Sequence, residues 1–187
     1  EVTTLPGVNT IADGTAVKTP GKNIFPYIQK NLDDIITVPD EELVVAFLDI
    51  VENHKMVVEN SGLLTVAALK HLNVQNQRVV SILSGGNMDI ITMSSVVQQG
   101  LIFRDRIFTV SVLLPDKPGM LSKVADVIAK ENGNVIKLEH NQFVSINRSA
   151  AVELRITLET FGTEHKNQII KALEEKGYQP KQVRTNI

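Results

Sequence analysis

The chain has 187 residues, a hydrophobic fraction of 43% and a formal net charge of −2, which describe a globular protein of one or two domains with a sizeable core. The small net charge argues against nucleic acid as the main partner. The absence of cysteine excludes disulfides, thiolate catalysis and thiolate metal sites, and is compatible with a reducing cytoplasm. No apolar run reaches the roughly 18 residues of a membrane span, so we expect no membrane partner.

The first half of the chain alternates strand-like and helical segments. Residues 35–38 predict a short strand, and apolar residues at helical spacing follow the acidic turn 40–42. A second helical stretch, 62–72, leads into a β-branched strand at 78–83. This order of apolar strands and helices predicts an α/β layer with a mostly parallel sheet.

The expected strand at 78–83 ends at the sequence Ser84-Gly85-Gly86-Asn87. A buried strand that ends in a glycine-rich turn brings backbone and short polar side chains close to a cofactor in α/β enzymes. Glycine and asparagine are also common in ordinary turns, so the pattern by itself favours a simple strand-to-helix turn, and only the flanking motifs favour a cofactor loop.

The spacing of apolar residues changes after residues 98–106, and an alternating strand is expected at 108–114. The Pro-rich turn 115–119 follows, with Pro118 expected in the first turn of a helix that ends at Gly133.

Two further strands are expected at 134–140 and 152–158, the second with perfect inward and outward alternation. Thr163 is expected to cap a last helix, which ends at Gly177 before a final short strand. The order β-α-β-β-α-β predicts a ferredoxin-like fold with both helices on one sheet face and the other face free for a partner.

Residues 106–184 resemble an ACT domain, a small-molecule-sensing module of many amino-acid enzymes. The stretches that carry the resemblance are Leu114-Pro-Asp-Lys-Pro-Gly-Met-Leu121, Asn132-Gly-Asn-Val135 and residues 152–160. The resemblance implies that an amino-acid effector binds between two ACT copies and that the chain self-associates through them. The residues that it implicates in effector binding are Asp116, Pro118, Gly119, Met120, Leu121 and Asn134.

Residues 10–92 are similar to the C-terminal third of the catalytic domain of threonine ammonia-lyases. The matching motifs are residues 10–18 (Thr-Ile-Ala-Asp-Gly-Thr-Ala-Val-Lys), 33–43 and Ser84-Gly-Gly-Asn-Met-Asp89. The resemblance implies an α/β fold: a partial tryptophan-synthase-β-like domain (fold type II) over 1–100, followed by the ACT domain over 101–187. It also implies pyridoxal phosphate as the cofactor, and L-threonine or L-serine as the substrate of the whole enzyme.

Carried over from that family, Ser84 would hydrogen-bond the pyridine nitrogen of the cofactor, and Gly85 and Gly86 would let backbone approach its ring. Asn87 would hold the loop, while Glu59 and Gly14 would lie beside the cofactor. One motif departs from the family: Glu59-Asn-Ser-Gly-Leu63 stands where most members have Glu-Pro-Ala-Gly-Ala.

The Schiff-base lysine and the glycine-rich phosphate loop of the family would both precede this chain, so no catalytic residue is assigned and we expect the chain alone to be inactive. The four histidines show no ligand-like spacing, so no metal site is expected, and His165 is expected at the surface. A first residue that is not Met suggests a chain processed or cut from a longer one, with exposed apolar faces that favour association.

The sequence therefore predicts a fragment of a pyridoxal-phosphate-dependent threonine ammonia-lyase, which converts L-threonine to 2-oxobutanoate and ammonia, joined to an amino-acid-sensing ACT domain. Two alternatives stay open. One is a non-enzymatic ACT module that binds amino acids and dimerises, and the other is a serine dehydratase or racemase relative.

Overall fold

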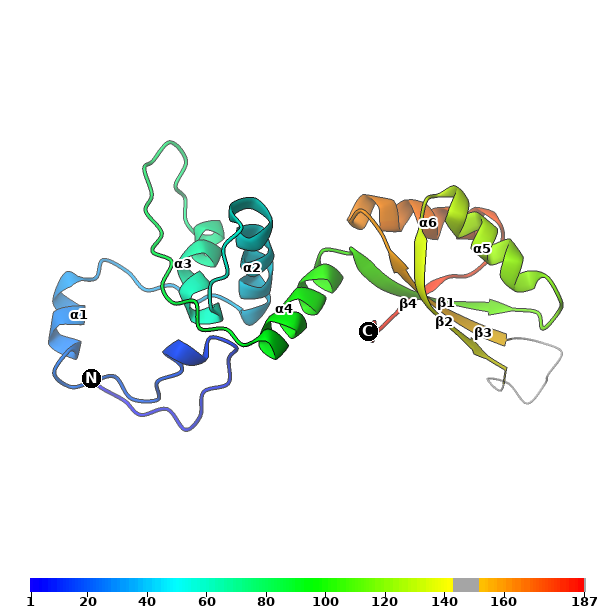
Figure 1. Cartoon of the computed structure of the whole chain (residues 1–187). Helices are drawn as coiled ribbons and strands as arrows, with labels where there is room; N and C mark the ends of the chain where they lie inside the picture. The colour runs from blue at the N-terminus through cyan, green and yellow to red at the C-terminus, as the bar shows by residue number, and fades with distance from the viewer. Residues whose placement is uncertain (143–151, 187) are drawn as a thin grey trace. The chain divides into compact units, whose positions relative to one another are not determined.

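The computed structural model describes residues 1–142 and 152–186, which form two compact units, Glu1–Gly100 and Leu101–Ile187. Figure 1 shows the elements of both units along the chain. Within the described residues, no helix has the length and apolar character needed to cross a bilayer. The units are described separately below.

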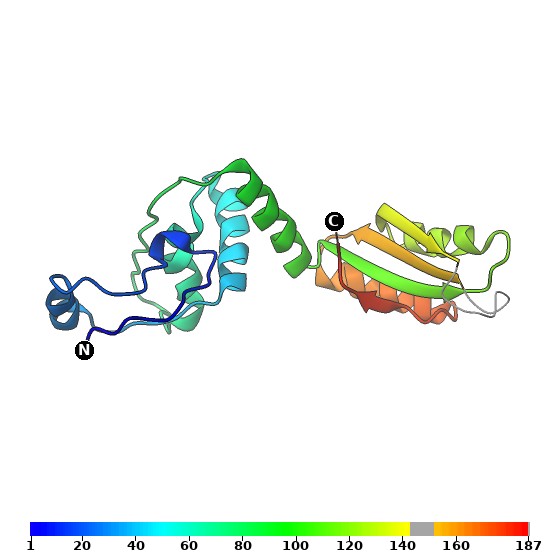
Figure 2. The same ribbon diagram turned by 90° about the horizontal axis from the view of Figure 1, so that it is seen from below.

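The second unit is a four-stranded antiparallel sheet with two helices, as predicted. Its strands are β1 (Ile107–Leu114), β2 (Asn134–Asn141), β3 (Val152–Glu159) and β4 (Lys181–Val183), in the order β2-β3-β1-β4. Helices α5 (Met120–Lys130) and α6 (Thr163–Glu175) both lie on one face of this sheet, as Figures 1 and 2 show from two directions. The ferredoxin-like order β-α-β-β-α-β is thereby confirmed.

The core of this unit forms where alternate side chains of β1 and β3 meet the two helices. Val110 lies opposite Ile156 in the antiparallel register, and both side chains are buried against α5 and α6. Burial of one such side chain contributes about 1.5–3 kcal/mol. The inward positions predicted for 152–158 are confirmed, because Val152, Leu154, Ile156 and Leu158 are all buried. The outward position predicted for Thr157 is wrong: this residue is buried, and its hydroxyl lies 2.9 Å from that of Thr109 on β1.

The helix ends depart from the predictions in their details. Helix α5 begins at Met120, after Gly119 in the left-handed region (φ 84°), so Pro118 precedes the helix instead of lying in its first turn. Its C-terminal stop involves two residues: Asn132 takes the left-handed conformation (φ 61°), and the Gly133 N–H donates to the carbonyl of Ile128 (2.9 Å).

The predicted cap of α6 is wrong. Gly162 occupies the N-cap position, and Thr163 is the first helical residue. The Thr163 hydroxyl donates to Asp105 Oδ2 (2.7 Å), and Lys166 Nζ contacts Asp105 Oδ1 (2.8 Å). The hydroxyl therefore bonds a carboxylate that is distant in sequence, a partner that local capping rules cannot anticipate.

His165 is buried and not at the surface, with 8% of its area exposed. The Phe161 N–H donates to its Nδ1 (3.1 Å), and its Nε2 lies 2.5 Å from the carbonyl oxygen of Glu131. The ring also stacks on Phe161, with 4.9 Å between ring centroids. Because Nδ1 accepts a hydrogen bond and Nε2 faces a carbonyl oxygen, the ring proton lies on Nε2. The two hydrogen bonds connect the start of α6 to the end of α5.

The first unit is built from short helices. They are a 3₁₀ turn at Asp13–Thr15, α1 (Phe25–Asn31), α2 (Asp40–His54), α3 (Leu64–Ala67) flanked by 3₁₀ turns at Asn60–Leu63 and Ala68–His71, and α4 (Ile90–Phe103), whose last residues belong to the second unit. The buried side chains of α2, including Leu43 and Phe47, pack with Leu63. Helix α4 approaches α2 at Gly100, where an added Cβ would lie 2.5 Å from Leu48 Cδ1.

Four predictions for this unit are wrong. Its described residues include no strand, so the two strands predicted at 35–38 and 78–83 are absent, and so is the parallel sheet. A strand exists only when a neighbour accepts and donates its backbone hydrogen bonds, and here Ile35 and Val80 are 73% and 88% exposed. The predicted helix 62–72 is divided among one α-helical and two 3₁₀ segments.

Candidate functional site

The glycine-rich loop 84–87 packs directly on the turn that begins at Glu59. An added Cβ on Gly62 would lie 1.8 Å from the Ser84 carbonyl oxygen. The Glu59 N–H donates to the Gly85 carbonyl (3.3 Å), and the Gly62 N–H donates to the Glu59 carbonyl (2.9 Å). Glycine at position 62 thus allows two backbone segments to touch.

Gly85 adopts a φ of +77°, and its missing side chain leaves room for the Glu59 carboxylate. A Cβ on Gly85 would lie 2.2 Å from Glu59 Oε1. Gly14 reaches the same carboxylate from the N-terminal segment, since its Cβ would lie 3.6 Å from Glu59 Oε1. The structure therefore brings together three residues predicted from distant motifs: Gly14, Glu59 and Gly85.

The other three predicted residues of this loop, Ser84, Gly86 and Asn87, are exposed. Space does not require glycine at position 86, where an added Cβ would make only a borderline contact at 3.4 Å with the Val57 carbonyl. Asn87 lines the cavity described next, together with Glu59.

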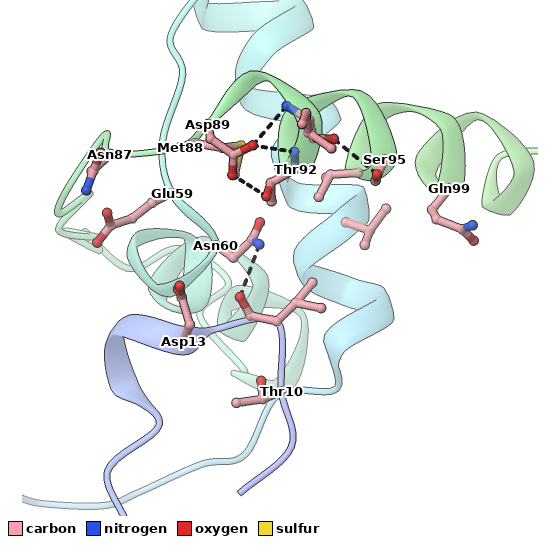
Figure 3. Close-up of a pocket in the computed structure, with 14 residues that line it drawn as sticks. Thr10, Asp13, Glu59, Asn60, Asn87, Met88, Asp89, Thr92, Ser95 and Gln99 are labelled. Atoms are coloured by element: carbon pink, nitrogen blue, oxygen red, sulfur yellow. Dashed lines mark hydrogen bonds between the residues drawn. The ribbon is translucent and has the colours of Figure 1, made fainter.

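A cavity of about 400 Å³ lies between this loop, α2 and α4 (Figure 3). Its lining residues are Thr10, Ile11, Asp13, Val44, Glu59, Asn60, Asn87, Met88, Asp89, Ile91, Thr92, Ser95, Val96 and Gln99. Asp89 accepts hydrogen bonds from the Ile91 N–H (2.9 Å) and from the N–H and hydroxyl of Thr92. The hydroxyl of Thr92 is the largest cause of the lowered pKa of Asp89.

Two buried polar atoms beside this site, Asn60 Oδ1 and Ser61 Oγ, have no hydrogen-bond partner among the described residues. Neither residue was among the predicted site residues. The sequence did contain a feature that could have drawn attention to them: Asn60 and Ser61 stand where most members of the family described above have Pro-Ala.

The turn between β1 and α5 forms a second cavity, of about 340 Å³. Five predicted effector-binding residues line it: Asp116, Pro118, Gly119, Met120 and Leu121. The rest of the lining is mostly apolar, and it also includes Lys117 and His140. An added Cβ on Gly119 would meet no atom within 4 Å, so the backbone here is open to close approach.

Asn134, the sixth predicted residue, lies away from that cavity at the other end of β2 and donates to Glu159 Oε2 (3.1 Å). His140 is the β2 side chain that lines the cavity, and no motif in the sequence selected it. Among the described residues, no group of three or more histidine, aspartate or glutamate side chains converges as a metal site requires.

Comparison with known proteins identifies both parts of the chain. Residues 1–85 match the family model of pyridoxal-phosphate dependent enzymes, and residues 108–177 match the ACT domain model. The L-threonine ammonia-lyase of Geobacter sulfurreducens is 36% identical over 180 residues, which cover 95% of this chain and 45% of that protein. The L-threonine ammonia-lyase of Thermotoga maritima is 32% identical, over 92% of this chain and 43% of that protein.

A solved structure of the processed form of threonine deaminase isoform 2 from Solanum lycopersicum is 27% identical, covers 53% of this chain and 28% of that chain, and has a TM-score of 0.49. The chain spans less than half the length of the two ammonia-lyases. Residues 1–85 are therefore similar to part of the pyridoxal-phosphate dependent enzymes and residues 108–177 to ACT domains, an arrangement consistent with a C-terminal fragment of a threonine dehydratase.

Proposed function

We propose that the chain is the C-terminal part of a threonine ammonia-lyase that converts L-threonine to 2-oxobutanoate and ammonia, and that its second unit regulates this activity. Residues 1–100 supply part of the catalytic domain and residues 101–187 form the regulatory ACT domain. The observation that carries the proposal is the contact of Glu59 with Gly85, which joins two motifs shared with that family at one point beside Ser84.

The residues of this loop fit the ring end of pyridoxal phosphate. Gly85 leaves no side chain between the loop and the Glu59 carboxylate, and Ser84 exposes a hydroxyl in the adjoining position. In this proposal the Ser84 hydroxyl bonds the ring nitrogen, and the backbone of Gly85 and Gly86 lies against the ring. When bound, pyridoxal phosphate supplies the electron sink that an amino acid needs to lose its α-proton and then its β-hydroxyl.

The role of Glu59 follows from its position. Its carboxylate lies against both Gly14 and Gly85, so it fixes the distance between the N-terminal segment and the Ser84 loop. The Schiff-base lysine and the phosphate-binding loop come from the remainder of the parent protein in this proposal. The isolated chain then contributes binding contacts for the cofactor without completing the active site.

We further propose that the cavity at the β1–α5 turn binds an aliphatic amino acid as effector. Leu114, Met120, Leu121, Val152 and Leu154 supply an apolar lining for its side chain. Asp116 suits its ammonium group, and the uncapped backbone N–H groups at the start of α5 suit its carboxylate. Asn134 of a second ACT copy completes this site in a self-associated assembly.

Relatives in Pasteurella multocida and Haemophilus influenzae are named L-threonine dehydratase biosynthetic IlvA. Their names support a role in isoleucine biosynthesis, and the cysteine-free composition supports a cytoplasmic location. A biosynthetic enzyme of this kind gains from an ACT domain because an end product bound there can lower its activity through linked conformational equilibria.

The decisive test uses the parent protein. We expect the reading frame upstream of the Glu1 codon to encode a lysine and a glycine-rich loop of the family, and the purified product to release ammonia from L-threonine when pyridoxal phosphate is present. Ser84→Ala should lower kcat, whereas Ser94→Ala, an exposed serine of α4 outside the cavity lining, should not. Absence of threonine-dependent ammonia release, or an initiation codon directly before Glu1, would overturn the proposal.

A further inference from the structure

Asp105 follows α4 in a backbone conformation that favours glycine. Its φ is +52°, and its N–H donates to the Ile102 carbonyl (3.0 Å). The next N–H, that of Arg106, donates to the Leu101 carbonyl (2.8 Å). These are the two hydrogen bonds of a Schellman motif, whose left-handed position is usually glycine because a Cβ is disfavoured there. An aspartate at this position therefore indicates that its side chain has a separate role.

The side chain of Asp105 contacts the first turn of α6. Its Oδ2 accepts the Thr163 hydroxyl (2.7 Å), and its Oδ1 accepts Lys166 Nζ (2.8 Å). Only 18% of the Asp105 side chain and 12% of the Lys166 side chain are exposed. Removing one partner of an ion pair that is so far withdrawn from water is costly, whereas a pair at the surface contributes little.

The backbone beside Asp105 is bonded to the segment that leads into α6. The Thr160 hydroxyl donates to the Asp105 carbonyl, and the Thr160 N–H donates to the Arg106 carbonyl (2.8 Å). Arg106 Nε donates in return to the Thr160 carbonyl (3.0 Å). Asp105, Arg106, Thr160, Thr163 and Lys166 together form the Asp105 junction. It joins the end of α4 to the start of α6.

A second helix end in the same unit shows what the aspartate adds. Asn132 follows α5 with a φ of +61°, its N–H donates to the Ala129 carbonyl (3.0 Å), and the Gly133 N–H donates to the Ile128 carbonyl (2.9 Å). The backbone motif is the same as at Asp105, but the Asn132 side chain is exposed and has no hydrogen-bond partner among the described residues. The bonds from Asp105 to α6 are therefore not a requirement of the helix end itself.

The start of α6 is also bonded to the end of α5. His165 Nε2 lies 2.5 Å from the carbonyl oxygen of Glu131, the residue that follows α5. Helix α5 begins at Met120, in the lining of the effector cavity. The first turn of α6 is thus bonded to the helix that begins at this cavity and to the residue that follows α4. Contiguous hydrogen-bonded elements of this kind can carry energetic coupling between sites.

We propose that the Asp105 junction transmits the state of the ACT domain to α4, and that Asp105 is a positioning residue for regulation of the catalytic unit. This inference rests on the proposed function, because it names the route by which an effector acts on the lyase. Removal of the carboxylate should leave effector binding and basal catalysis in place and remove the response to the effector. Coupling is a free energy shared between two sites, so it can be lost while each site still binds its ligand.

Hydrogen–deuterium exchange of the full chain tests the junction without cofactor or effector. Asp105→Gly suits the left-handed backbone and removes the carboxylate. Amides of residues 97–103 should exchange about tenfold faster in this variant, which corresponds to an opening easier by 1.4 kcal/mol. Asn132→Gly is the matched control, and amides of residues 124–130 should exchange no faster in it than in the wild type. If Asp105→Gly does not fold, Thr163→Val removes one of the two carboxylate bonds and should give a smaller acceleration.

The parent protein tests the regulatory role, with L-isoleucine as the aliphatic amino-acid probe. In Asp105→Gly, kcat for L-threonine without L-isoleucine should stay within about twofold of the wild-type value. The Kd of L-isoleucine, measured by calorimetry, should stay within about threefold. Inhibition by saturating L-isoleucine should be lost. A merely structural role would instead lower basal activity or weaken binding and leave the response in place.

Wild-type exchange of residues 97–103 in folded Asp105→Gly would overturn the proposal, and so would inhibition by L-isoleucine that persists in this variant. An equal acceleration at α5 in Asn132→Gly would show that glycine at any left-handed helix end produces the effect, which also overturns it. A parent protein without L-threonine activity would refute the proposed function instead, and the exchange experiment would still decide whether α4 depends on the Asp105 carboxylate.

Discussion

Substitution of Gly62 by alanine should separate the Ser84 loop from the turn at Glu59. The added Cβ would lie 1.8 Å from the Ser84 carbonyl oxygen and 2.8 Å from Val58 Cγ1. Ordinary contact begins near 3.4 Å, so the loop has to retreat by about 1.6 Å, and the obstructing atom is backbone that no rotamer change can remove. Overpacking of this kind costs about 1–3 kcal/mol.

Hydrogen–deuterium exchange followed by mass spectrometry measures this cost separately in each unit. Peptides that include residues 59–63, where the N–H groups of Glu59 and Gly62 are hydrogen-bonded, should exchange about 5- to 100-fold faster in Gly62→Ala, whereas peptides from β1 should be unchanged. Gly7→Ala is the matched control, because a Cβ there meets no atom within 4 Å and the backbone is not left-handed. Wild-type exchange in folded Gly62→Ala would refute the packing argument.

Three further predictions concern the second unit. Lys166→Met should lower the free energy of unfolding by about 1–3 kcal/mol, because it leaves the largely buried Asp105 carboxylate without its ion-pair partner (2.8 Å); urea denaturation checks this. The Ser111 hydroxyl, which donates to Glu153 Oε1 (2.7 Å), is the main cause that holds the pKa of Glu153 below its ordinary value. Since a lowered pKa in the folded state contributes stability above the unfolded value of 4.5, this contribution should disappear as the pH falls below that value, and Ser111→Ala should reduce the slope of the urea midpoint against pH in that range. Leu154→Ala should cost about 2–5 kcal/mol, because the side chain is fully buried between the sheet and the helices; a loss below 1 kcal/mol in the same assay would contradict the assigned core.

The sequence predicted the second unit well because its patterns are local and strong. Every second residue of strand β3 from Val152 to Leu158 is apolar and buried, and the amphipathic helix α5 repeats its apolar residues at helical spacing. Such patterns fix which face of each element is buried before any long-range contact forms. Errors arose where a distant partner decides the outcome, as for Thr163, whose hydroxyl bonds Asp105.

The first unit was harder to predict for the same reason. The β-branched segment 78–83 has a strand-like composition, but a strand needs a hydrogen-bonded neighbour, and none is present among the described residues of this unit. His165 was misplaced because a histidine in a first helical turn resembles a surface residue until the carbonyl of Glu131 and the N–H of Phe161 bond both ring nitrogens.

The sequence by itself determined the order of elements in the second unit, the glycine-rich turns, and the residue types available at both candidate sites, because these follow from periodicity, turn chemistry and recognisable motifs. Only the tertiary structure decided which of them meet. It placed Glu59 against Gly85 and Gly14, left Asn60 Oδ1 without a partner among the described residues, and put His140 instead of Asn134 in the cavity at the β1–α5 turn. Contacts between residues far apart in sequence depend on the packing of whole elements, and no local pattern in the chain encodes that packing.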